Sequence, residues 1–173
     1  MTNGELQKYL ISLSDGDRAA FEKIYENLST PMYTIILRIT HDRSLSEDIL
    51  QEVFVKLYLS PPTSAGNPRA YLFQMAHNLA VDGARKNPQF VDLEDCEKLA
   101  GLPADDFSQR MEIEDALESL PSAECNIVSL HINGGFKFRE ISDILGIPLG
   151  TVIWRYHRAI KSLRSYLSGG NTL

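Results

Sequence analysis

Four basic side chains recur at three-residue steps late in the sequence: Arg155, Arg158, Lys161 and Arg164. In a helix, this spacing places them along a slowly rotating stripe, from which they can contact nucleic-acid phosphates or the edges of bases. They can equally form an ordinary solvated helix face. The residues before them help to separate these two interpretations.

A short helix and a tight break precede the basic stripe. The pattern predicts a helix over 138–145, a turn at Gly146-Ile147-Pro148 and a final helix from about 149 to about 167. Gly146 suits the left-handed position after a helix end. This is the plan of a helix-turn-helix, whose second helix enters the major groove. The turn, and the lack of acidic residues after Asp143, favour DNA binding. The inward side of the final helix is predicted to hold Val152, Ala159, Leu163 and Leu167.

The earlier part of the sequence also has helical periodicity. Apolar steps predict a helix that stops near Leu28 and restarts at Pro31, because proline lacks a backbone N–H. The capping-box pattern Ser44-Leu45-Ser46-Glu47 predicts a helix start, and that helix ends before Pro61-Pro62. Asn67-Pro68 is predicted to cap and open the next helix. Further helices are predicted over 111–120 and 121–131, so we expect an all-α fold.

The net charge of −6 is distributed unevenly along the 173 residues. Residues 1–90 carry a net −1, residues 91–120 a net −8 and residues 121–173 a net +3. Exposed charges farther apart than a Debye length are largely screened, so the local balance decides which surface can approach DNA. We therefore predict two small helical domains, 1–88 and 111–173, joined by an acidic linker over 89–110.

Several classes of protein are disfavoured. No apolar run approaches the ~18 residues of a membrane span, and the first residues, MTNGELQKYL, lack the pattern of a secretory signal. Two cysteines make no disulfide framework, so a cytoplasmic location is expected. The four histidines are scattered and no glycine-rich phosphate loop occurs, so we expect no metal, no cofactor and no enzymatic activity.

Four segments in order resemble bacterial sigma factors of the extracytoplasmic-function group, across nearly the whole chain. GDRAAFEKIY (16–25) is similar to the start of their region two, and SEDILQEVFVKLY (46–58) to the segment that binds core RNA polymerase. NPRAYLFQMAHNLAVDGARK (67–86) is similar to the promoter-melting, minus-ten segment. The stretch from LPSAECNIVSL to HRAIKSLR (120–164) is similar to region four, which reads the minus-thirty-five element.

The resemblance implies two sets of binding residues in the first domain. The core polymerase contact would use Asp48, Gln51, Glu52 and Phe54. A plain amphipathic helix is the alternative interpretation of that segment. The minus-ten contact would use Arg69, Tyr71, His77, Asn78, Arg85 and Lys86, with a flipped base captured in the loop 60–67. Because many relatives carry more arginines near Arg85, we expect weak non-specific DNA affinity and strong dependence on polymerase.

In the second domain, the resemblance implies that the minus-thirty-five contact uses Thr151, Ile153, Trp154, Arg155, His157, Arg158 and Lys161. Arg158 is the best candidate for a bidentate guanine contact. Ile153 cannot donate a hydrogen bond, which leaves contact with a thymine methyl group. Trp154 either packs against the sugar-phosphate edge or supports the domain.

The expected partners are core RNA polymerase, promoter DNA and an anti-sigma factor, without membrane insertion. Two alternatives stay open at this point. One is a helix-turn-helix regulator that binds operator DNA unaided, and it leaves the segment 48–54 without a role. The other is a sigma-like decoy that only sequesters an anti-sigma factor.

Overall fold

The structure is a computed structural model that describes residues 1–86, 115–117 and 119–169. Every regular element in these ranges is an α-helix, so the expected all-α fold is confirmed. The described residues form two compact units, the first with helices α1 to α4, the second with α6, α8 and α7 as far as Ser142. The predicted linker 89–110 and half of the predicted helix over 111–120 lie outside the described residues, and the predicted domain limits stay predictions.

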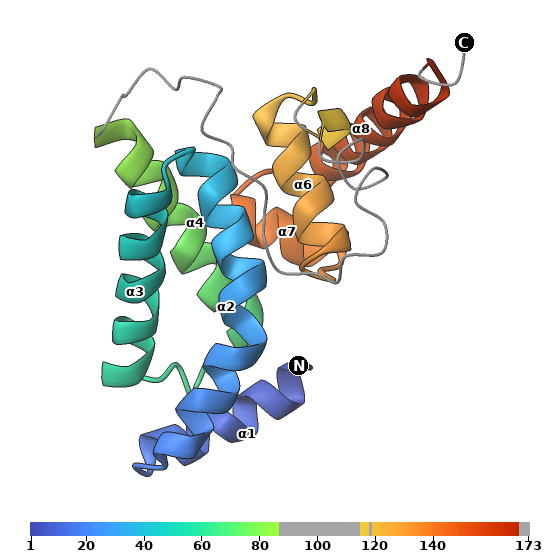
Figure 1. The fold of residues 1–173 in the computed structure, drawn as a ribbon. Helices are drawn as coiled ribbons and strands as arrows, with labels where there is room; N and C mark the ends of the chain where they lie inside the picture. The colour runs from blue at the N-terminus through green and yellow to red at the C-terminus, as the bar shows by residue number, and fades with distance from the viewer. Residues whose placement is uncertain (87–114, 118, 170–173) are drawn as a thin grey trace, which may run out of the picture. The chain divides into compact units, whose positions relative to one another are not determined.

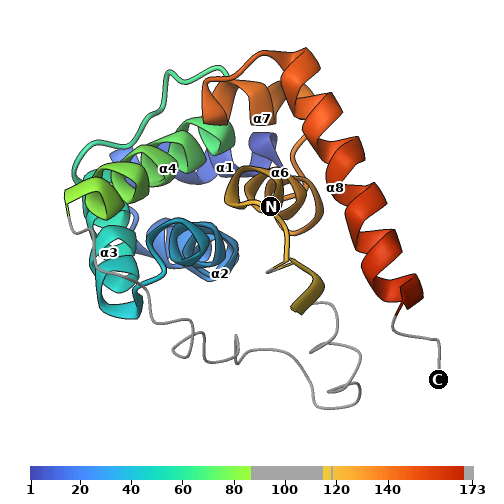
Figure 2. The same cartoon turned by 90° about the horizontal axis from the view of Figure 1, so that it is seen from above.

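Helix α2 is the centre of the first unit. It contacts each of the other three helices of this unit, and Figures 1 and 2 show α3 and α4 beside it. The helices are α1 (Asn3–Ser14), α2 (Arg18–Thr40), α3 (Arg43–Leu59) and α4 (Pro68–Lys86). Their apolar faces meet in a core whose largest fully buried side chains include Leu6, Leu10, Ile24, Leu28, Met32, Ile35, Ile36, Leu57, Leu72 and Phe73.

Helix α2 runs from Arg18 to Thr40 with Pro31 inside it, so the predicted interruption between Leu28 and Pro31 is wrong. A proline inside a helix costs about 3 kcal/mol or more, because one hydrogen bond is lost and its ring crowds the preceding turn. Residues on both sides of Pro31 are buried, including Leu28, Met32 and Ile35. Each buried apolar side chain contributes about 1.5–3 kcal/mol, so packing along the whole length outweighs the local defect.

Helix α3 begins at Arg43, which corrects the predicted capping box at residues 44–47. Asp42 is the N-cap, and its carboxylate accepts the Leu45 N–H at 2.9 Å. Ser46 is instead fully buried, with its Oγ 2.6 Å from the Thr40 Oγ1 and bonded to the Asp42 carbonyl. Buried hydroxyls need partners, so Ser46 fastens the corner between α2 and α3. The helix ends at Leu59, before Pro61-Pro62 as predicted.

Helix α4 begins where the sequence predicts. The Asn67 side chain accepts the Ala70 N–H at 3.0 Å, and Pro68 is the first helical residue. The Arg69 N–H donates to the Asn3 Oδ1 at 3.2 Å. A side chain of α1 therefore satisfies a second amide at the start of α4.

The second unit contains α6 (Ser122–Ile132), α7 (Phe138–Leu145) as far as Ser142, and α8 (Leu149–Gly169). The turn after α7 has Gly146 at a φ of 65°, and the Ile147 N–H bonds back to the Ser142 carbonyl at 3.2 Å. This Schellman pattern confirms the predicted helix-turn-helix break. Val152 and Ala159 of α8 are fully buried as predicted, and Leu163 packs beside them. Leu167 is 45% exposed, so its predicted inward position is wrong: it lies beyond the part of α8 that packs on this core.

The connection between α6 and α7 leaves no room for a side chain at Gly134. The N–H groups of Asn133 and Gly134 both donate to the Ser129 carbonyl, at 2.9 and 3.0 Å, and close the end of α6. A Cβ atom at Gly134 would lie 2.5 Å from the Leu130 carbonyl oxygen and 2.7 Å from the ring of the buried Phe136. Glycine therefore allows Phe136 to fold back over the helix end.

We expect Gly134→Ala to lower the free energy of unfolding of the second unit by about 1–3 kcal/mol, as overpacking in a core does. Gly150→Ala is the control, because nothing lies within 4 Å of a Cβ there and alanine favours a helix. Urea unfolding followed by fluorescence reports on this unit, since Trp154 is the single tryptophan of the chain. Equal stability of the two variants would contradict the close approach at Gly134.

Candidate nucleic-acid interface

The outward side of α8 is set by the side that packs inward. Ala159 belongs to an apolar cluster with Leu120, Cys125 and Val128, flanked by Leu117, Tyr156 and Leu163. The exposed side chains then follow the i, i+3, i+4, i+7 spacing of one helix face. Among the predicted readers, the exposed ones are Trp154, His157, Arg158 and Lys161. The other predicted readers, Thr151, Ile153 and Arg155, are half-buried along the edges of this face.

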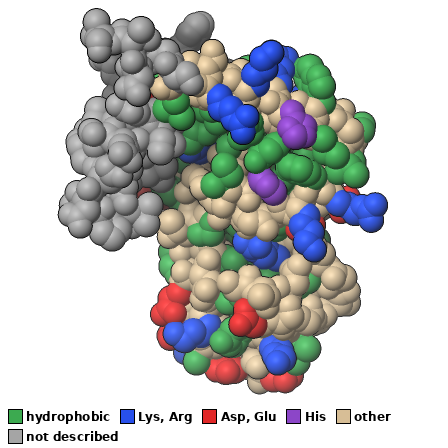
Figure 3. Space-filling view, turned by 90° about the vertical axis from the view of Figure 1, so that its right-hand side faces the viewer, with side chains coloured by type: hydrophobic (Ala, Val, Ile, Leu, Met, Phe, Trp, Pro, Cys, Tyr) green, Lys and Arg blue, Asp and Glu red, His purple; other side chains and the backbone are tan. Residues whose placement is uncertain are grey.

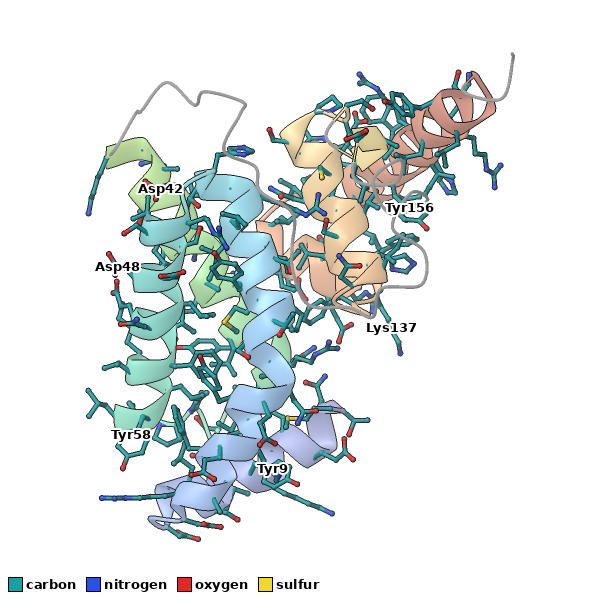
Figure 4. All side chains as sticks on the ribbon, viewed as in Figure 1. Tyr9, Asp42, Asp48, Tyr58, Lys137 and Tyr156 are labelled. Atoms are coloured by element: carbon teal, nitrogen blue, oxygen red, sulfur yellow. The ribbon has the colours of Figure 1, made fainter. Side chains whose placement is uncertain are left out.

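An aromatic cluster holds α8 against α6 and α7. Tyr156 lies with its ring centroid 4.9 Å from that of Phe138 and 5.0 Å from that of His131. Figure 4 labels Tyr156 on the side of α8 that faces α6. The His131 ring stacks on Phe138 at 4.7 Å, and its Nδ1 lies 2.8 Å from the Phe136 carbonyl oxygen. This cluster fixes the direction in which the exposed face of α8 points.

Arg158 has two partners inside its own unit. Its Nε lies 3.2 Å from Oε1 of Glu124, whose side chain is only 5% exposed. Its Cζ lies 5.3 Å from the centroid of the Trp154 ring, which is 58% exposed. Sequence spacing did not predict Glu124, because its contact crosses from the first turn of α6 to the middle of α8. An acidic residue at the start of the mainly apolar stretch 124–130 was the one signal available.

Helix α4 presents three of its predicted residues on one face. Tyr71, Asn78 and Arg85 are seven residues apart and exposed, while Leu72, Phe73 and Ala76 point into the core. Lys86 is also exposed at the helix end, and Arg85 forms a solvent-exposed pair with Asp82 at 3.9 Å. Such exposed ion pairs contribute little free energy, so Arg85 and Lys86 both remain available to contact phosphate.

Arg69 and His77 lie lower on the sides of α4 and are half-buried. The Arg69 guanidinium lies 5.8 Å from the centroid of the Phe73 ring. Burial lowers the pKa of His77 below its usual 6.5, against a smaller raising effect of a hydrogen bond with the Asn78 side chain. A neutral imidazole next to Asn78 is therefore favoured at neutral pH.

The loop before α4, residues 60–67, is tied to α1. The Gln7 Nε2 donates to the Thr63 carbonyl, and Asn3 reaches the start of α4 as described above. Inside the loop, the Thr63 N–H donates to the Pro61 carbonyl at 2.8 Å. The sequence did not predict that α1 positions this loop, because both contacts link residues more than fifty positions apart.

The predicted polymerase-binding residues divide between the two sides of α3. Asp48, Gln51 and Glu52 are exposed, and Figure 4 shows Asp48 projecting outward from this helix. Glu52 pairs with Lys56 at 2.7 Å. Phe54 is only 4% exposed and packs on Tyr25, with ring centroids 4.7 Å apart. Its side chain therefore supports α3 from inside, contrary to the expected direct contact.

Exposed apolar residues extend the polar face of α3. Val55 is 54% exposed and Leu59 is 75% exposed, and both follow Gln51 at four-residue steps. Side chains four residues apart lie on the same side of a helix. The outward face of α3 is thus acidic and polar at one end and apolar at the other, which suits a protein partner better than DNA.

Basic side chains are dispersed. On the face drawn in Figure 3, the Lys and Arg side chains are separated by hydrophobic, His and other polar surface. Among the described residues, no group of three or more His, Cys, Asp or Glu side chains could hold a metal ion. In the same ranges, no helix has the length and apolar character that a membrane crossing requires.

Comparisons of the sequence with family models and with individual proteins indicate the same family. The sequence model of Sigma-70 region 2 matches residues 24–88, and that of Sigma-70 region 4 matches residues 110–163. The chain is 27% identical to the ECF RNA polymerase sigma factor SigK of Mycobacterium ulcerans (strain Agy99), over 94% of both chains. It is 27% identical to the ECF RNA polymerase sigma factor SigL of Mycobacterium tuberculosis (strain Erdman), over 86% of this chain and 89% of the other.

Two solved structures share the fold. CnrH in complex with the cytosolic domain of CnrY matches with a TM-score of 0.65 and 17% identity, over 95% of this chain and 98% of the other. The sigma factor RpoE in complex with the anti-sigma factor NepR, from Bartonella quintana, matches with a TM-score of 0.63 and 22% identity. That match covers 86% of this chain and 96% of the other.

The pKa of His77 is directly measurable. We expect NMR titration of its imidazole protons to give a value below 6.5, because burial penalises the charged ring. Between the folded-state pKa and about 6.5, the His77 imidazole is protonated in the unfolded chain and neutral in the folded chain. Stability is therefore complete above about pH 6.5 and is lost as the pH falls through the folded-state pKa. His77→Gln should remove this part of the acid sensitivity. A measured value at or above 6.5 would overturn the assignment.

Proposed function

Since this chain belongs to the sigma-70 family of RNA polymerase sigma factors, in its extracytoplasmic-function group, we propose how its three exposed surfaces divide the work of promoter recognition. The chain binds core RNA polymerase and directs transcription initiation at promoters. The observation that carries this function is the order of the two matched regions, 24–88 and 110–163, with a helix-turn-helix formed by α7 and α8 in the second.

In our proposal, α8 reads the minus-thirty-five duplex through Trp154, His157, Arg158 and Lys161. Their position on one exposed helix face supports this role. Lys161 would contact phosphate, and Arg158 would contact a guanine edge through two donors. Ile153, half-buried at the edge, would contact a thymine methyl group. Thr151 and Arg155 lie near the start of the helix and would contact the DNA backbone.

We propose that α4 and the loop 60–67 capture the melted minus-ten strand. Tyr71 can stack on an unpaired base, Asn78 can bond a base edge, and Arg85 can hold phosphate on the same helix face. Lys86 adds a second phosphate contact. Arg69 and His77, which are half-buried, would act at the border of this surface. The loop stays in place because α1 holds it.

We propose that core polymerase docks on the outward face of α3. Asp48, Gln51 and Glu52 would bind basic and polar groups, and the apolar Val55 and Leu59 would bury against the same partner. The domain limits 1–88 and 111–173, a cytoplasmic location and the absence of catalytic activity belong to this proposal. An anti-sigma factor is a proposed further partner, because the similar sigma factor RpoE is bound to the anti-sigma factor NepR in its solved structure.

Transcription with purified core polymerase tests the function. We expect the chain to direct initiation from specific promoters on genomic templates, with transcript 5′ ends that identify those promoters. An operator-binding regulator would bind duplex DNA alone and give no transcript. A decoy would bind an anti-sigma factor without forming an active holoenzyme. The absence of both core binding and transcripts would refute the proposed function.

Charge reversal on α3 tests the docking face. We expect Asp48→Lys to weaken core binding at least tenfold, about 1.4 kcal/mol, because a like charge would face a basic surface. Glu22→Lys is the matched control, since it changes the net charge equally on the exposed side of α2. Fluorescence anisotropy of labelled protein with core polymerase measures both. Equal affinities for the two variants would remove α3 from the interface.

Arg158→Lys tests the base reader. Lysine keeps the positive charge near Glu124 but lacks the planar pair of donors. We expect a loss of about 1–3 kcal/mol in discrimination at one base pair of the minus-thirty-five element. Arg164→Lys, farther along α8, should leave the promoter preference unchanged. The two are compared by transcription from promoters that differ at single positions of that element. Unchanged discrimination by Arg158→Lys would assign base reading to another residue.

A further inference from the structure

We propose that Glu124 is a positioning residue that keeps Arg158 in the orientation for base reading and reduces its use as a phosphate contact. The proposal rests on the proposed role of Arg158 at the minus-thirty-five element. It assigns a function to a residue of α6, which lies outside the helix that would enter the DNA groove. The geometry of three side chains carries it: Glu124, Trp154 and Arg158.

The Glu124 contact constrains one end of the guanidinium. Oε1 lies 3.2 Å from Nε of Arg158, so this contact does not use the two terminal Nη groups. Those groups are the pair that can reach the O6 and N7 acceptors of one guanine. The Trp154 ring, one turn earlier on α8, lies 5.3 Å from Cζ and restricts the guanidinium from a second side. Less side-chain entropy then has to be lost when DNA binds.

A contribution to folding stability does not explain why a carboxylate is buried at position 124. The residue is 4% exposed, and its Oε2 is buried and has no hydrogen-bond partner among the residues that the structure describes. A buried carboxylate with an unsatisfied oxygen is unfavourable, and buried ion pairs are often no more stable than apolar replacements. The position in the first turn of α6 and the contact with Arg158 offset part of this cost. The carboxylate therefore fits a role in binding better than a role in folding.

The negative charge also distinguishes between the two things that Arg158 could bind. A phosphate that approaches the guanidinium meets the Glu124 carboxylate as a like charge a few ångströms farther in. A guanine edge carries no net charge, so the Glu124 carboxylate weakens its binding to Arg158 less than it weakens the binding of a phosphate. Salt screens a buried charge weakly, so the difference persists at cellular ionic strength. Glu124 therefore lowers the affinity for DNA of unrelated sequence more than it lowers the affinity for the correct minus-thirty-five sequence.

The test uses holoenzyme assembled from core polymerase and the full chain. Binding is measured to duplex promoter DNA, identified by 5′-end mapping, and to the same DNA with a scrambled minus-thirty-five element, over a range of salt concentrations. We expect Glu124→Gln to bind the scrambled DNA more tightly and to lower the promoter-to-scrambled ratio at least about fivefold. Its dependence on log salt should steepen by about one unit, because Arg158 gains a phosphate contact.

Two controls isolate the mechanism. Asp143→Asn removes one negative charge from the exposed surface of α7, and it should leave both the ratio and the salt dependence unchanged. In an Arg158→Ala background, Glu124→Gln should have no further effect on the ratio, because the side chain through which Glu124 acts is then absent. An effect of the same size in that background would show that Glu124 acts through another residue and would overturn the proposal.

A structural role for Glu124 would reduce binding to both DNAs equally and leave the ratio intact, which would also overturn the proposal. If Glu124→Gln does not fold, Glu124→Asp is measured in its place. It keeps the charge and withdraws the carboxylate by one methylene, so the ratio should fall while the salt dependence stays constant, and an unchanged ratio would refute the inference. Wild-type holoenzyme that does not distinguish the two DNAs would instead refute the proposed function.

Discussion

Burial of one face of every helix is the constraint on which the binding surfaces of this protein depend. An amphipathic helix is stable only when its apolar stripe is covered, and the residues that remain outside are then fixed by the helical period. In α3, burial of Val53 and Leu57 leaves Asp48, Gln51 and Glu52 outside. In α8, burial of Val152 and Ala159 leaves Trp154 and Arg158 outside in the same way. Packing thus selects the residues that can reach polymerase or DNA.

Where local chemistry decides a boundary, the sequence predicted it. Gly146 marks the turn of the helix-turn-helix, and Asn67 with Pro68 marks the start of α4. Where distant residues decide, prediction failed. The continuity of α2 across Pro31 depends on packing against three other helices. The Asp42 cap is an exception, because the corner that buries Ser46 is formed by residues only six positions apart, and the sequence pattern still misplaced the cap.

The candidate site shows the same division. The helix that bears Arg158 and the polar side of α3 follow from periodicity. The exposed face of α8 holds Arg158 and Lys161 of the basic stripe together with Trp154 and His157, while Arg155 is half-buried at its edge, because the helical period is near 3.6 and not three. Phe54 was assigned to the polymerase contact from the resemblance, although its ring packs inward against Tyr25. Glu124 could not be found from spacing, since it lies on another helix.

The anchoring of the loop 60–67 by α1 has a consequence for the exchange of parts between relatives. Gln7 and Asn3 lie before residue 24, where the match to region 2 begins, yet they hold the loop and the first turn of α4. The unit that would set minus-ten specificity is therefore discontinuous in the sequence. A chimaera that receives only the loop 60–67 lacks the contacts that Gln7 and Asn3 provide. The matching α1 residues must be transferred with the loop to keep its conformation in the recipient protein.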